Sequence, residues 1–423
     1  MQLEQVLTEL GLPDSRELLE PHWEESEASL PEQGPAFLRP REISASRECL
    51  RLAPEAEPVV QAAAERVREN PALLHLAWHC YRLLFYHRDY ESSRIARWPT
   101  LERTLGDLAG PFYLLLAMAS PSLIRPVHLA RGIPEAITRL SCGHFPELIG
   151  NYRMVRGDQR AWGIDLRVLY WLRHYVAGDL YTLGRMEYMV RPFWGTIRAF
   201  RHRDTNEVVA LAGEGTRFNA EGFINADQAT DAEGGWTARL VEESGLVRGC
   251  PISPAGVGLR DEVELPLASW RRVLAPGDPI LDTHIPAGGG MTPERCADTM
   301  RRALEFFPRY LPDRPFVGFA CGSWILNPQL EWIYSPTSNM VLWQRELYLF
   351  PIPSGGQSGL YFIFGQDDPD PATAPRDTSL RRALLDQVAA GGRVIAGGMF
   401  FLKEDFPHFG SQYYRRHWPP KAL

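Results

Sequence analysis

The sequence contains almost no lysine: Lys403 and Lys421 are the only two among its 45 basic residues. We attribute this bias first to the base composition of the genome, and second to arginine's planar fork, which binds phosphate well. Acidic residues also outnumber basic residues, so the formal net charge is -7. A chain of this charge is not expected to have nucleic acid as its main partner, because such partners select basic surfaces.

Close pairs of cysteine are also missing. The six cysteines are scattered along the chain, at Cys49, Cys80, Cys142, Cys250, Cys296 and Cys321. This spacing indicates neither a disulfide framework nor a clustered zinc site. We therefore expect a protein without structural disulfides and without a metal cofactor.

Long apolar runs are absent as well. The longest run, Phe112–Ala119, is far shorter than the roughly 20 residues that a helix needs to cross a bilayer. The first residues form an acidic, amphipathic segment without the basic start and apolar core of a signal peptide. We expect a cytoplasmic protein with no membrane partner.

The length of 423 residues favours two domains, and the content of 45% hydrophobic and 23% charged residues is that of a globular chain. Apolar residues at helical spacing predict helices in the first part of the chain. These helices are expected at residues 59–68, 72–86, 101–108, 134–140 and 166–176. The sequence thus predicts a helical domain over residues 1–180.

The pattern changes after Leu183, where short apolar segments and turn residues predict strands. The strands are expected at residues 184–193, 196–203, 207–213, 235–244, 261–267, 279–286, 316–324, 340–352, 359–365 and 394–402, with loops or irregular hairpins at 213–235. Helices are expected after 292 and at 327–334 and 377–392. The fold class is α+β, with a mixed, mostly antiparallel sheet in a second domain over residues 181–423.

One stretch, LDTHIPAGGGMTPE (Leu281–Glu294), runs from a strand through three glycines into a helix start. Thr292 suits the N-cap and Pro293 the first helical position. The free N–H groups of such a helix start bind anions, and Gly288, Gly289 and Gly290 would let a phosphate approach the backbone. A tight turn capped by Thr292 explains the same residues, and Glu294 would compete with a phosphate for the positive end. The glycines alone leave both interpretations open.

The order of elements after this stretch resembles the acyl-CoA-binding half of the GNAT superfamily of N-acyltransferases. The phrases LGRMEY (Leu183–Tyr188), LDTHIPAGGGMTPE, ACGSWILNPQLE (Ala320–Glu331) and DTSLRRALLDQVAAGGR (Asp377–Arg393) are similar to a bacterial family of acyltransferases. In that family an all-helical N-terminal domain precedes a GNAT-like domain. No Walker pattern or spaced dinucleotide fingerprint occurs, so nucleotide binding of those kinds is not indicated.

The resemblance implies that the loop after the fourth strand binds the pyrophosphate of acyl-CoA or acetyl-CoA, a co-substrate. The residues carried over to this role are Ile285, Gly288, Gly289, Gly290, Met291 and Thr292. Ile285 departs from the family pattern, which has Gln or Arg there. In the superfamily, a tyrosine seven residues after an asparagine protonates the CoA thiolate. Asn327 and Tyr334 have this spacing, with Pro328 between them as a departure, and a helix-end tyrosine explains Tyr334 equally well.

Acyl transfer to an amine needs a base, because a protonated amine has no lone pair for attack. His284 ends the strand that enters the glycine loop, and Asp282 shares its face of that strand. We expect His284 to act as the base and Asp282 to orient it or to bind the amine, although a strand-end histidine bonded to backbone is the plain alternative. Glu187 is a weaker candidate base that would act through water.

Other groups are explained by structure alone. His75 and His79 are spaced for metal chelation, but two ligands do not make a closed site. Cys321 lies near the end of a predicted buried strand, where a thiol is commonly inert. The chain lacks the Gly-x-Ser-x-Gly elbow of serine hydrolases.

The sequence therefore predicts a CoA-dependent N-acyltransferase that acts by direct attack of a small-molecule or peptide amine. The competing hypotheses are a non-catalytic binding module and a thioester hydrolase or decarboxylase on the same fold. The oligomeric state, the acceptor and the acyl length are not predicted.

Overall fold

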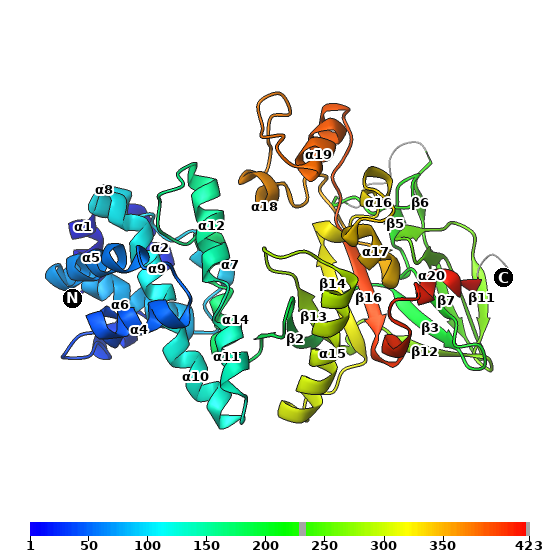
Figure 1. The fold of residues 1–423 in the computed structure, drawn as a ribbon, viewed down its shortest axis with the longest axis horizontal. Coiled ribbons are helices and arrows are strands. Elements are labelled where there is room, and N and C mark those ends of the chain that lie inside the picture. The colour runs from blue at the N-terminus through cyan, green and yellow to red at the C-terminus, as the bar shows by residue number, and fades with distance from the viewer. Residues whose placement is uncertain (228–233, 420–423) are drawn as a thin grey trace. The chain divides into compact units, whose positions relative to one another are not determined.

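The computed structural model describes residues 1–227 and 234–419, and it divides into two compact units, Met1–Thr182 and Leu183–Leu423. The division lies two residues beyond position 180, where the sequence places it. Figure 1 colours the elements of each unit along the chain, from the blue N-terminus to the red C-terminus. Part of the segment 213–235, namely residues 228–233, lies outside the described residues.

The first unit is helical, as the sequence predicts. Its helices are α1 (Leu3–Leu10), α2 (Arg16–Leu19), α3 (Trp23–Ala28), α4 (Pro40–Cys49), α5 (Ala56–Glu69), α6 (Pro71–Phe85), α7 (Ser92–Ile95), α8 (Glu102–Leu105), α9 (Ala109–Ala117), α10 (Ser120–Ala130), α11 (Glu135–Ser141), α12 (Phe145–Arg156), α13 (Leu166–Leu169) and α14 (Leu172–Val176). Three 3₁₀ turns join them, η1 (Pro13–Ser15), η2 (Ala36–Leu38) and η3 (Gly106–Leu108), and the short β1 (Tyr181–Thr182) ends the unit.

Helix α9 forms the centre of this unit. It is apolar on every side, and its side chains from Phe112 to Ala117 are all buried, as expected of a helix surrounded by others. By length and composition, the segment Glu102–Ala130 would qualify as a membrane span, yet 72% of its most apolar part is buried inside the protein. That burial is typical of a core helix.

The second unit is built on strands. They are β2 (Glu187–Pro192), β3 (Arg198–His202), β4 (Val208–Leu211), β5 (Arg217–Phe218), β6 (Trp236–Thr237), β7 (Leu240–Glu243), β8 (Leu246–Gly249), β9 (Pro251–Ser253), β10 (Val257–Gly258), β11 (Val263–Pro266), β12 (Trp270–Leu274), β13 (Pro279–His284), β14 (Gly318–Ser323), β15 (Tyr348–Pro351) and β16 (Gly397–Leu402). Its helices are α15 (Pro293–Tyr310), α16 (Leu330–Ile333), α17 (Asn339–Glu346), α18 (Leu360–Phe364), α19 (Ser379–Ala389) and α20 (Tyr413–Arg416), with 3₁₀ turns η4 (Trp324–Leu326) and η5 (Lys403–His408).

The main sheet of this unit has the order β2-β13-β14-β16-β15. The pair β13–β14 is parallel, whereas β2–β13, β14–β16 and β15–β16 are antiparallel. A second sheet has the order β10-β9-β4-β3-β12, and its face holds a cluster that includes Phe200, Val209 and Trp270. These observations confirm the α+β class and the mixed, mostly antiparallel sheet.

Helix α15 begins where the sequence places it. Thr292 is the N-cap, its hydroxyl accepts a hydrogen bond from the N–H of Arg295, and Pro293 is the first helical residue. Thr299 fixes this helix to the start of β2. Its buried hydroxyl donates to the carbonyl of Leu183 (2.6 Å) and accepts from the N–H of Met186 (3.1 Å). The helix and the residues before β2 therefore form one packed body (Figure 1).

Two strand predictions are wrong. Within residues 340–352 only β15 is a strand, and α17 precedes it, because Ser338 caps that helix by accepting from the N–H of Val341. Residues 359–365 form α18 rather than a strand. Gly359 (φ 82°) and Gly365 (φ 79°) bound this short helix in the left-handed region, where glycine is favoured.

Candidate functional site

The two central strands of the main sheet separate partway along their length. Strands β13 and β14 pair only at Leu281 with Phe319 and at Asp282 with Ala320. Beyond this point β13 stays paired with β2 as far as His284, while β14 stays paired with β16 as far as Ser323. The sheet therefore opens between the ends of β13 and β14.

Three titratable side chains share one face of β13 and β2 at this opening. Asp282 and His284 are two residues apart, and Oδ2 of Asp282 lies 3.2 Å from Nε2 of His284. Glu187 pairs directly with His284 across the antiparallel strands and is 3% exposed. Opposed residues of such a pair have Cβ atoms on the same side of the sheet, about 5 Å apart. The structure thus brings together the predicted base, its predicted partner and the second candidate base.

Arg185, which is not among the predicted site residues, is hydrogen-bonded to the glycine loop. Arg185 donates from Nη1 to the carbonyl of Pro286 (2.8 Å) and from Nη2 to the carbonyl of Gly288 (3.2 Å). Gly288 has φ 98°, a conformation that other residues rarely adopt. The guanidinium therefore fixes two carbonyls on either side of the turn.

A second arginine, Arg295, lies beside Gly289 of the loop. A Cβ atom placed on Gly289 would come within 2.5 Å of Nη1 of Arg295, whereas one on Gly290 would meet nothing within 4 Å. Arg295 is in the first turn of α15, so its charge adds to the positive end of the helix. Met291 is buried and anchors the loop from inside.

Ile285 is half-buried at the end of β13, where the family pattern has Gln or Arg. Its apolar side chain offers no hydrogen bond to a phosphate. Arg185 and Arg295 supply guanidinium groups to the same loop from other positions in the chain. The only local signal for them is that Arg185 lies in the phrase LGRMEY and Arg295 follows Glu294.

Tyr334 has apolar surroundings. Its ring packs on a cluster formed by side chains such as Leu330, Leu360 and Leu384, and burial raises the pKa of its hydroxyl. The predicted helix over 327–334 is reduced to the four residues of α16, so that Asn327 and Tyr334 flank it. Asn327 instead caps a turn, because its Oδ1 accepts from the N–H of Gln329 (2.9 Å). Among the hydrogen bonds of the described residues, none joins Tyr334 to Asp282 of the Asp282–His284 pair.

The histidines of the helical unit do not make a metal centre in this arrangement. His79 is buried and bonded through Nδ1 to Oγ of Ser26 (2.8 Å). His22, His87 and Asp89 lie close together, but the two imidazole rings are stacked, with centroids 3.9 Å apart and planes 18° from parallel. A metal ion binds in the plane of each ring, and nearly parallel planes share no such position. The cluster is therefore a hydrogen-bonded group.

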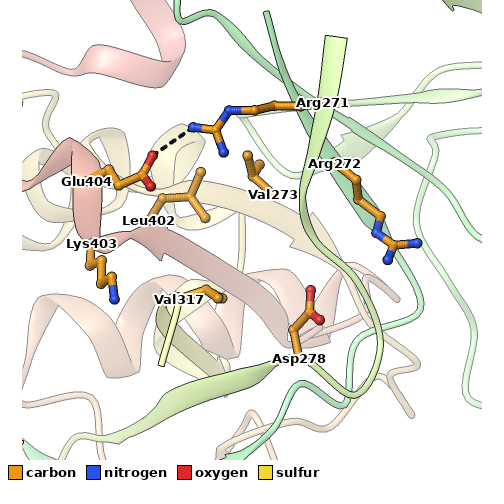
Figure 2. A pocket seen from close by; sticks show the side chains of 8 residues that line it. All are labelled: Arg271, Arg272, Val273, Asp278, Val317, Leu402, Lys403 and Glu404. Carbon is orange, nitrogen blue, oxygen red and sulfur yellow. Dashed lines mark hydrogen bonds and ion pairs between the residues drawn. The ribbon is translucent and has the colours of Figure 1, made fainter. Parts of the chain in front are cut away.

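A separate pocket lies at the other end of the main sheet. It has a volume of about 370 Å³ and is lined by Arg271, Arg272, Val273, Asp278, Val317, Leu402, Lys403 and Glu404. Figure 2 shows Arg271 paired with Glu404 along one side and Asp278 on the other. Asp278 precedes β13 and Leu402 ends β16, so the length of β13 separates this pocket from His284. Because of its position and its mixed charges, this pocket is not part of the site formed by the glycine loop.

Comparisons with known proteins agree with this geometry. Residues 42–178 match the model of the N-acyltransferase N-terminal domain, and residues 180–400 match the model of the GNAT-like C-terminal domain. No curated protein matches the chain. Solved structures similar to it include an acyltransferase in complex with decanoyl-CoA and teicoplanin (TM-score 0.64) and an acyltransferase in complex with CoA and 10C-teicoplanin (TM-score 0.65). Each is 20% identical, with 95% of this chain and 99% of the other covered, and this likeness concerns the fold.

A sheet that opens beside a glycine loop and a capped helix defines the GNAT-like class of acyltransferase domains. The family match is more specific: the chain belongs to the acyltransferases with a helical N-acyltransferase N-terminal domain and a GNAT-like C-terminal domain.

Proposed function

We propose that this acyltransferase moves an acyl group from acyl-CoA to the amine of a small-molecule acceptor by direct attack. The observation that carries the proposal is the position of the Asp282–His284 pair, at the open end of the sheet and beside the loop that Arg185 holds. Family membership and the CoA ligands of the similar solved structures support the choice of donor. Because acyl-CoA is an intracellular thioester, the proposal also places the enzyme in the cytoplasm.

The donor would be bound by its pyrophosphate. The N–H groups of Gly288 to Thr292 are the proposed donors to the pyrophosphate, and α15 adds the positive end of its dipole. Arg185 turns the carbonyls of Pro286 and Gly288 toward itself, which keeps these acceptors away from the phosphate. Arg295 adds a charged donor beside Gly289.

The chemistry needs one proton acceptor and one proton donor. The amine nitrogen attacks the thioester carbonyl, a C–N bond forms, and the C–S bond breaks as the tetrahedral intermediate collapses. His284 accepts the amine proton. With its Nε2 beside Oδ2 of Asp282, the carboxylate holds the ring and stabilises the imidazolium that forms. Glu187 lies next to His284 across the strands and extends the route for the proton.

Tyr334 is the proposed donor of a proton to the CoA thiolate. Burial raises the pKa of its hydroxyl, so the group is protonated at neutral pH, as an acid must be. The family spacing from Asn327 is the ground for this role.

The test measures CoA release from octanoyl-CoA with and without a series of amines, while calorimetry follows CoA binding. His284→Gln should lower kcat by 10²-fold or more and leave the dissociation constant of CoA within about twofold. Its remaining rate should rise about tenfold per pH unit below the pKa of the amine, because the amine must then lose its proton to water. His408→Gln, at an exposed histidine of η5, is the matched control.

Three results would contradict the proposal. An unchanged rate for His284→Gln removes the histidine as base. CoA release that does not depend on any amine indicates a thioester hydrolase. Binding of CoA without any thiol release indicates a binding module.

A further inference from the structure

The pocket near the start of β13 lies outside the proposed acyl-transfer site, and its charges are not balanced within the fold. Its volume of about 370 Å³ is within the range of pockets that bind small molecules. Its lining comes from strand β12, the turn before β13, the residue before β14, and the segment that leads from β16 into η5. Figure 2 shows charged side chains around three apolar ones, Val273, Val317 and Leu402.

A bulge in β12 explains why successive residues of this strand line the pocket. The register of β12 on β3 shifts between Arg272 and Leu274, so Val273 is an extra residue in the strand. In a regular strand, Arg271 and Arg272 would point to opposite faces of the sheet. A bulge bends the strand and re-aims its side chains. Here Arg271, Arg272 and Val273 all line the same pocket.

Three of the charged side chains in the pocket already have partners in the fold. Nη2 of Arg271 lies 3.0 Å from Oε2 of Glu404, so these two charges neutralise each other. Asp278 is held in position, because its Oδ2 accepts a hydrogen bond from the N–H of Ala275 (2.7 Å) in the turn before β13. A carboxylate has further acceptor positions, so Asp278 can still bind a cation.

The other two charged side chains, Arg272 and Lys403, are cations without a carboxylate partner among residues 1–227 and 234–419. Both are exposed. Nζ of Lys403 lies 5.3 Å from the centre of the Phe316 ring, and this is a contact with an aromatic face rather than with an anion. Figure 2 shows the ammonium group of Lys403 and the guanidinium group of Arg272 on different sides of the pocket. The pocket therefore offers two separate positions for acidic groups.

We propose that this pocket binds a small acidic amino acid. One carboxylate of the ligand lies at Lys403, the other at Arg272, and the ammonium group at Asp278. Two negative groups and one positive group in the ligand mirror the two cations and one carboxylate that the pocket presents. The carbon chain of the ligand lies over Val317. This site is independent of the proposed acyl transfer, since the length of β13 separates it from His284.

A ligand-observed NMR titration of the full-length protein measures this binding without any acyl-CoA. The probes are L-glutamate and L-aspartate at constant ionic strength, because salt weakens exposed ion pairs. An exposed ion pair contributes up to about fivefold in affinity, so dissociation constants in the millimolar range are expected. Glutarate lacks the ammonium group and L-glutamine lacks the second carboxylate, and each should bind about fivefold more weakly than L-glutamate. The proposal is overturned if neither acidic amino acid binds, or if glutarate binds as well as L-glutamate.

Three substitutions assign the groups of the ligand to the side chains of the pocket. Asp278→Asn retains an acceptor for the N–H of Ala275 and hence the turn, and it should remove the advantage of L-glutamate over glutarate. Lys403→Met and Arg272→Met should each weaken L-glutamate about fivefold. One of these two variants should also remove the advantage of L-glutamate over L-glutamine.

Arg217→Met is the matched control, because Arg217 is an exposed strand arginine of β5 that does not line the pocket. It should leave the affinity for L-glutamate unchanged. Binding of L-glutamate that is unaltered in both Lys403→Met and Arg272→Met would show that the amino acid binds elsewhere, and it would refute the proposal.

Discussion

Replacement of Arg185 by methionine is the most direct test of whether the glycine loop binds the pyrophosphate of the acyl-CoA donor. The guanidinium makes two charge-assisted hydrogen bonds, to the carbonyls of Pro286 and Gly288. Hydrogen bonds to charged groups contribute about 1.5–3 kcal/mol each when buried, but water replaces part of this here because Arg185 is only half-buried. We expect the loop to lose about 1–2 kcal/mol of preorganisation, which corresponds to a 5- to 30-fold weaker affinity for CoA.

The assay compares two ligands by calorimetry. CoA carries the pyrophosphate, whereas pantetheine has the same thiol arm without it. Arg185→Met should weaken CoA and leave pantetheine unchanged, and Arg185→Lys should fall between the two. Arg198→Met is the control, since Arg198 forms an exposed ion pair with Glu242 on other strands of the same unit.

Two results would refute this reasoning. An unchanged affinity for CoA would mean that the loop needs no arginine to hold its shape. An equal loss for CoA and pantetheine would mean that Arg185 supports the unit as a whole rather than the phosphate site.

Three further predictions concern the loop and the stability of each unit. Gly289→Leu should displace the guanidinium above it and weaken CoA binding about tenfold, measured by calorimetry, whereas Gly290→Leu enters open space and should change it little. Asp405→Asn breaks the buried ion pair in which Nη2 of Arg201 donates to both carboxylate oxygens, and it should cost about 3–5 kcal/mol in denaturant unfolding. The exposed Glu404→Gln should cost almost nothing. Burial lowers the pKa of His79 to about 3, so the folded state loses stability as pH falls below about 6.5; His79→Gln should remove about 2 kcal/mol of the loss between pH 7 and pH 5.

The sequence predicts those parts of the fold that depend on neighbours in the chain. The start of α15 follows from Thr292 and Pro293 alone, and the hairpin between β3 and β4 follows from the turn that ends at Asn206, whose φ is 62°. The sequence of an apolar segment does not distinguish a helix from a strand when both faces of the segment are buried. Residues 359–365 show this, because side chains such as Leu360 and Phe364 pack inside a cluster whether they are in a helix or a strand.

Contacts between distant residues could not be predicted in this way. Arg185 reaches carbonyls about a hundred residues further on, and Thr299 donates to the carbonyl of Leu183. Such contacts depend on how helices and strands pack, and no local pattern encodes that packing. His284 and Asp282 could be selected because they are two residues apart on one strand, where alternation fixes their common face.

Strand β2 connects the two halves of the proposed mechanism. Arg185, which fixes the glycine loop, lies just before this strand. The first residue of the strand, Glu187, pairs with His284. Thr299 of α15 in turn fixes Leu183 and Met186, so the helix start at the proposed phosphate site and the strand that positions the proposed base are packed together. The loop and the base are nevertheless held by different side chains. A defect in Arg185 should therefore appear in donor affinity, and a defect in His284 should appear in the chemical step, within a single folded protein.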